Sequence, residues 1–196
     1  GNERRDPAWA MIQLAVVMGD IVMPIDTQQL AFRQQLLTAL APFPAVQDYL
    51  LQMRFKPRPR FNTGLFLDLD NGIFEGDLVG EMIPQPDVET AAGTCKLDTV
   101  LGQGFALIAQ DRVGAEALAG LEDDCFMGLP LGRAYLPYRS DSSAMEPARA
   151  QDPRARLLRT HRDQILLIRP DRYCAAAFMP EDLAEGMARF AALMRA

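Results

Sequence analysis

The sequence predicts an α/β fold, in which a helical first segment is followed by a segment where strands and helices alternate. After residue 62, compact apolar runs alternate with stretches whose apolar residues recur at helical spacing. Near the end, two apolar runs flank Pro170-Asp171, a pair that favours tight turns and so indicates an antiparallel hairpin. The predicted order is strand, helix, strand, hairpin and terminal helix, which is that of a thioredoxin-like domain.

Residues 1–55 are expected to form three helices that end the preceding region of a longer protein. Asp6 suits the N-cap of the first helix, with Pro7 in its first turn. Asp26 or Thr27 can cap the second, and the third is expected over residues 45–55. Their apolar residues require a partner surface, provided by the other two helices or by an upstream region.

Residues 56–61 are expected to be a linker. Lys56-Pro57-Arg58-Pro59-Arg60 alternates prolines with cations, and proline is excluded from helix interiors and central strands. A solvated, stiff linker is favoured over a basic patch for an acidic partner. The thioredoxin-like domain is then expected over residues 62–196.

Within this second segment, hydrophobic spacing and turn residues predict each element in turn. Residues 139–153 are polar and proline-containing, and a mobile loop is expected there. The final helix opens at Pro180-Glu181. Its apolar stripe is Leu183, Met187, Phe190, Ala191 and Met194. The other expected elements are strands at 65–69, 77–83, 105–109, 125–129, 164–169 and 173–178, a helical turn at 97–101, and a helix at 112–121.

Charge excludes one class of partner. The net charge is −6, whereas nucleic-acid binding depends on basic surface that neutralises phosphates. No apolar run approaches the roughly 20 residues that span a bilayer, and the charged opening Glu3-Arg4-Arg5 is unlike a signal peptide. We therefore expect a cytoplasmic protein without nucleic-acid or membrane partners.

The three cysteines do not predict redox chemistry. Cys95, Cys125 and Cys174 are far apart in sequence, and no pair has redox-motif or zinc spacing. Thiol–disulfide exchange would require two thiols after the strand at 105–109, where the chain reads Gln110-Asp111-Arg112-Val113-Gly114. Reduced, partly buried thiols are expected.

We also expect structural roles for the other polar residues. His161, the only histidine, lies among arginines, and we interpret it as an exposed turn residue rather than a general base. Asp68-Leu69-Asp70 resembles the start of a calcium loop, but Val79 stands where such a loop needs a carboxylate. We interpret this stretch and Glu122-Asp123-Asp124 as solvated turns.

The glycines give no nucleotide fingerprint. Gly72, Gly76 and Gly80, and the pair Gly102 and Gly104, do not form a G-x-G-x-x-G or Walker pattern. Turn and close-packing roles are expected. No catalytic, cofactor-binding or metal-binding residue is therefore predicted in this chain.

Several short stretches carry a family resemblance. They include Met53-Arg54-Phe55-Lys56-Pro57, Ile83-Pro84-Gln85-Pro86, Leu97-Asp98, Gly104-Phe105-Ala106-Leu107 and Arg169-Pro170-Asp171-Arg172-Tyr173. In this order the chain resembles the C-terminal region of flavin-dependent aromatic hydroxylases of the 3-(3-hydroxyphenyl)propionate hydroxylase and phenol hydroxylase type. The resemblance implies a parent monooxygenase that uses FAD and NADH or NADPH, with its flavin and substrate domains upstream. It also implies a C-terminal domain that lacks the redox cysteine pair and is structural or makes subunit contacts.

Two hypotheses about the function follow. In the first, the chain is the catalytically silent C-terminal part of such a monooxygenase, whose partners are the upstream domains and, through exposed apolar helices, a second copy. In the second, it is a free-standing thioredoxin-like interaction module that docks through Trp9, Leu36 and Leu37. A small enzyme using Cys174 or His161 has the least support.

Overall fold

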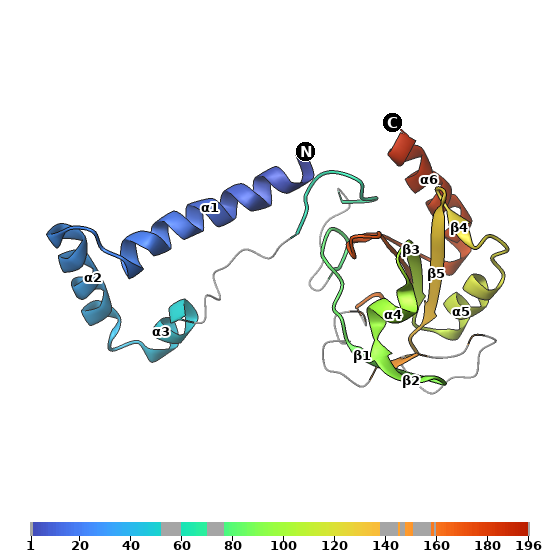
Figure 1. Ribbon diagram of the computed structural model, residues 1–196, viewed down its shortest axis with the longest axis horizontal. Coiled ribbons are helices and arrows are strands. Elements are labelled where there is room, and N and C mark those ends of the chain that lie inside the picture. The colour runs from blue at the N-terminus through green and yellow to red at the C-terminus, as the bar shows by residue number, and fades with distance from the viewer. Residues whose placement is uncertain are drawn as a thin grey trace. The chain divides into compact units, whose positions relative to one another are not determined.

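The computed structural model describes residues 2–51, 60–69, 77–137, 145, 148–150, 158 and 160–195. The chain divides into two compact units, Gly1–Phe61 and Asn62–Ala196 (Figure 1). Several expectations fall wholly or largely outside the described residues. These are the linker before residue 60, most of the loop at 139–153, Gly72, Gly76 and the second carboxylate of the 68–70 pair.

The first unit consists of three helices: α1 (Asn2–Val22), α2 (Thr27–Leu40) and α3 (Pro44–Leu51). Helix α1 begins at Asn2, so the expected start at Asp6 is wrong; the added turn contains Glu and Arg, which are good helix formers. The expected cap of α2 is confirmed, since Oδ1 of Asp26 accepts a 2.7 Å hydrogen bond from the Gln29 amide. No residue of α2 is buried.

The second unit is built on a five-stranded mixed sheet. Its strands are β3 (Phe105–Ala109), β4 (Cys125–Phe126), β5 (Leu129–Tyr135), β7 (Ile165–Ile168) and β8 (Cys174–Phe178). They lie in the order β4-β5-β3-β7-β8, with β3 and β5 parallel and the other neighbours antiparallel. Helix α5 (Arg112–Ala119) joins the parallel pair, and the 3₁₀ turn η2 (Pro180–Asp182) and helix α6 (Leu183–Arg195) follow β8. This βαβ–ββα arrangement confirms the thioredoxin-like fold.

A small second sheet, which the sequence did not predict, lies beside it. It contains β1 (Asp87–Thr90), β2 (Gly93–Lys96) and β6 (Arg149–Ala150), in the order β2-β1-β6. The short helix α4 (Leu97–Leu101) follows β2 directly. Only bridges at Val79 and Met82 replace the strand expected at 77–83.

One expected strand is a hairpin instead. The prediction of a single strand at 125–129 is wrong because Met127 and Gly128 both have positive φ, 53° and 77°, and turn the chain between β4 and β5. Two consecutive positive φ values are the geometry of a type I′ turn.

The main core fills the side of the central sheet that α5 and α6 cover. Strands β3 and β7 are buried at every position. Because side chains alternate along a strand, Phe105, Leu107 and Ala109 contribute to this core, and Ala106 and Ile108 face the opposite side. The remaining core residues include Leu118, Leu131, Ile165, Leu167, Ala176, Phe178, Leu183 and Phe190.

The expected terminal stripe is largely confirmed. Leu183, Phe190 and Ala191 are buried, and Met187 packs against the core. Met194 is the exception, with 36% of its surface exposed. Among the helices that the structure describes, none has both the length and the apolar character that crossing a membrane requires.

Candidate functional site

The three most distinctive stretches of the sequence meet in the second unit, at a polar cluster formed by Gln85, Asp98 and Arg172. The Gln85 side chain donates to Oδ1 of Asp98 (2.7 Å), and its own Oε1 accepts from the Asp98 amide (3.1 Å). The Arg172 guanidinium forms an ion pair with the same carboxylate and donates to the carbonyl of Gly102, where α4 ends. The cluster therefore ties the 83–86 segment, α4 and the β7–β8 turn together.

The backbone of Arg172 is also unusual. Its φ is 69°, in the left-handed region that non-glycine residues rarely adopt. Its amide donates to the Arg169 carbonyl (2.9 Å), and its carbonyl accepts from the Ile83 amide (3.0 Å). The strained conformation thus presents both the main chain and the side chain to the neighbouring segments.

Arg169 has a similar structural role on the same turn. Its guanidinium donates through two nitrogens to Asp171, at 3.1 and 2.8 Å, and lies 4.9 Å from the centre of the Phe66 ring. Bidentate pairing and ring stacking are the contacts that favour arginine over lysine. The Arg169 guanidinium thus pairs within its own turn and stacks on Phe66 of another segment.

Substitution of Arg172 tests whether these contacts outweigh the backbone strain. Arg172→Ala is expected to lower the free energy of unfolding by about 2 kcal/mol, because it leaves Asp98 and the Gly102 carbonyl without this partner while the strain remains. Arg172→Gly is expected to cost about 1 kcal/mol less than the alanine change, since glycine adopts positive φ freely. Urea unfolding of both variants measures the difference, and a glycine variant more stable than the parent chain would contradict a stabilising role for the side chain.

The position where a thioredoxin carries its thiols has a different occupant here. Asp111 is the N-cap of α5, and its Oδ1 accepts from the Gly114 amide at 2.7 Å. The neighbouring Gln110 is buried and donates to the carbonyls of Leu158 (2.5 Å) and His161 (3.2 Å). This strand-to-helix turn is held by a cap and a buried amide.

The cysteines are free thiols in three different environments: Cys174 is buried, Cys95 half-buried and Cys125 exposed. Within the described part of the chain, no group of three or more His, Cys, Asp and Glu side chains could hold a metal ion.

His161 corrects the sequence analysis, which placed it in an exposed turn. The residue is only 2% exposed. Its Nε2 accepts from the Leu78 amide (3.0 Å) and lies 3.3 Å from Oδ1 of Asp77, while Nδ1 lies 2.7 Å from Oε1 of Gln164. Because Nε2 accepts and the Gln164 oxygen can only accept, Nδ1 carries the ring hydrogen. The histidine thus connects the 77–79 segment to the turn before β7.

Two of the carboxylates interpreted as turn residues, Asp68 and Asp124, have cationic partners. Asp68, at φ 60°, accepts a 2.9 Å hydrogen bond from Arg189 of α6. Asp124 accepts at 2.9 Å from Arg133, whose guanidinium also donates to the Leu118 and Leu121 carbonyls around the end of α5. Gly102, at φ 72°, and Gly104 have the turn and close-packing roles expected of them.

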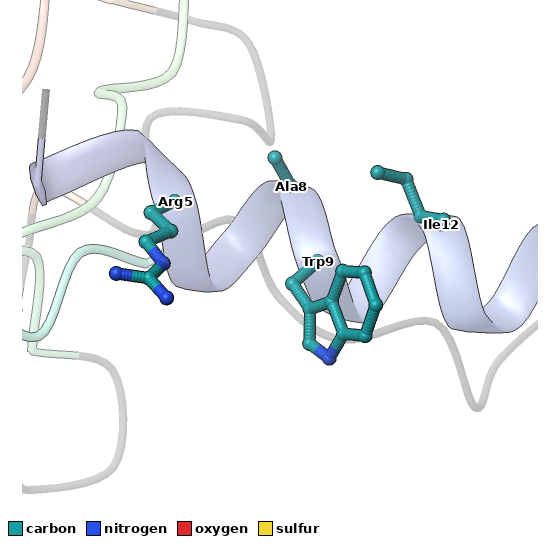
Figure 2. Close-up of a pocket in the computed structure, with 4 residues that line it drawn as sticks. All are labelled: Arg5, Ala8, Trp9 and Ile12. Atoms are coloured by element: carbon teal, nitrogen blue, oxygen red, sulfur yellow. The ribbon is translucent and has the colours of Figure 1, made fainter.

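The first unit presents an apolar face rather than a polar site. Figure 2 shows Arg5, Ala8, Trp9 and Ile12 along α1, and these residues line a hollow of about 480 Å³. Trp9 and Ile12 are 59% and 53% exposed. Large apolar residues continue this exposure through the unit, at Val16, Val22, Met23, Ile25, Leu30, Phe32, Leu37, Phe43, Val46 and Tyr49.

Comparison with known proteins gives the family. The HcaD C-terminal domain matches residues 80–193, which include the polar cluster and all five strands of the central sheet. The chain belongs to this family. The expected resemblance to aromatic hydroxylases is confirmed.

Curated relatives of this HcaD C-terminal domain protein are much longer. It is 37% identical over 190 residues to the 3-(3-hydroxy-phenyl)propionate/3-hydroxycinnamic acid hydroxylase of Burkholderia cenocepacia, a match that covers 89% of this chain and 34% of the relative. The hydroxylases of the same name from Klebsiella pneumoniae and Escherichia coli are 33% and 30% identical, with 93% and 98% of this chain and 34% and 36% of the relative covered. The chain therefore spans about a third of these relatives.

Two solved structures share the fold. OxyS anhydrotetracycline hydroxylase from Streptomyces rimosus has a TM-score of 0.55 at 19% identity, covering 96% of this chain and 33% of that one. The flavin-dependent monooxygenase PieE, solved with FAD and substrate, has a TM-score of 0.50 at 18% identity, covering 91% and 32%.

The residues of this HcaD-type domain do not fit FAD at the turn where the fold would offer a phosphate site. Proteins bind the pyrophosphate of a dinucleotide at a helix N-terminus that follows a glycine-rich turn. Here the Asp111 carboxylate already occupies the N-terminus of α5 and would repel a phosphate. The turn at Asp111 therefore provides no site for the pyrophosphate of a flavin dinucleotide.

Proposed function

We propose that this chain is the C-terminal, non-catalytic part of an FAD-dependent aromatic-ring monooxygenase that takes electrons from NADH or NADPH. The observation that carries the proposal is its membership of the HcaD C-terminal domain family together with relatives, named as hydroxylases, of which it spans about a third. In this reading the flavin, nicotinamide and aromatic-substrate sites belong to upstream domains. No catalytic, cofactor-binding or metal-binding residue is assigned to this chain.

A structural or subunit-contact role agrees with the chemistry of the second unit. Asp98 and Arg172 pair with each other, Asp111 caps a helix, and the His161 ring is enclosed by hydrogen-bonding partners. Each of these polar groups is bonded to another part of the chain and stabilises the fold.

We further propose that residues 1–55 complete the upstream substrate and flavin region, that 56–61 link it to the next domain, and that 62–196 form the thioredoxin-like domain. The exposed apolar residues of α1, α2 and α3 support this division. Large apolar side chains exposed in this number are typical of a segment that packs against a partner. The partners proposed are the upstream domains and a second copy of the enzyme, without nucleic acid or membrane, in the cytoplasm.

The natural polypeptide is therefore expected to be much heavier than the 21.7 kDa of this chain. An immunoblot of source cells with an antibody against this chain measures its size. The purified longer protein should show a flavin absorbance spectrum and oxidise NADH or NADPH faster when 3-(3-hydroxyphenyl)propionate is added.

The control is this chain alone, which should retain no FAD after gel filtration. A natural band near 21.7 kDa would contradict the proposal and favour a free-standing thioredoxin-like interaction module.

A further inference from the structure

We draw no further inference here: the strongest candidate, the apolar pocket of about 310 Å³ beside Met127, between the start of β3 and the end of α6, carries no proposal because nothing in the part of the chain that the structure describes shows what covers it.

Discussion

Gly132→Ala is expected to lower the free energy of unfolding of the thioredoxin-like unit by about 3 kcal/mol, the upper part of the range for overpacked sites. A Cβ built on Gly132 in β5 would lie 2.1 Å from the carbonyl oxygen of Leu101, the last residue of α4. Backbone atoms on both sides meet here, so no side-chain rotation relieves the overlap. Urea unfolding followed by circular dichroism measures the loss.

Gly120→Ala is the matched control within the same unit. The nearest atoms to its Cβ would be two carbonyl oxygens at 3.6 Å, which is ordinary contact, and its φ of −77° suits alanine. We expect a change within about 0.5 kcal/mol. If the two variants were equally stable, the close approach of α4 to β5 would not be what excludes a side chain at residue 132.

His161→Leu is expected to cost about 3 kcal/mol, because it leaves the buried Leu78 amide and the half-buried Gln164 oxygen without this partner. Leucine has similar bulk but cannot accept from the Leu78 amide or donate to Gln164. The same unfolding experiment measures the loss. Faster hydrogen exchange at residues 77–79 gives a local reading that a general loss of packing would not.

The control for this change is Arg162→Ala, one residue along. Arg162 pairs only with Asp163 among the contacts that the structure gives for it, and both side chains are more than 60% exposed. Such surface pairs contribute about 0–1 kcal/mol. A His161→Leu variant as stable as Arg162→Ala would show that the buried histidine network does not hold the 77–79 segment.

The parts of the fold that the sequence predicted correctly are those where local patterns determine the structure. Strand β3 is a continuous apolar run, α2 begins after the capping Asp26, and Pro170-Asp171 lies in the turn between β7 and β8. Each signal lies within a few residues of the element that it predicts.

The wrong predictions lie where contacts between residues far apart in the sequence determine the local structure. Strand β5 contains Pro130 and Gly132, which argue against a strand, but Pro130 precedes the ladder with β3 and Gly132 is required by α4. The β1–β2 hairpin is polar and gives no periodic signal. His161 is buried by a contact with Leu78, 83 residues away, that no local pattern contains.

Of the candidate site, the sequence predicts only the short motifs that contain its residues and their order along the chain. Gln85, Asp98 and Arg172 lie in stretches that are recognisable in the sequence, but no local pattern places the three residues in contact. The left-handed conformation of Arg172 and the pocket beside Met127 depend on tertiary structure. Neither has a signal in the order of residues.

The left-handed Arg172 also bears on how distant members of the family can be recognised. Many sequences can form a hairpin turn, and glycine would satisfy this backbone more easily than arginine does. An arginine at that position is useful only when an acidic residue opening a short helix and a glutamine 13 residues before it are present as well. A search that requires all three together would separate proteins that share this arrangement from those that share only the thioredoxin-like topology.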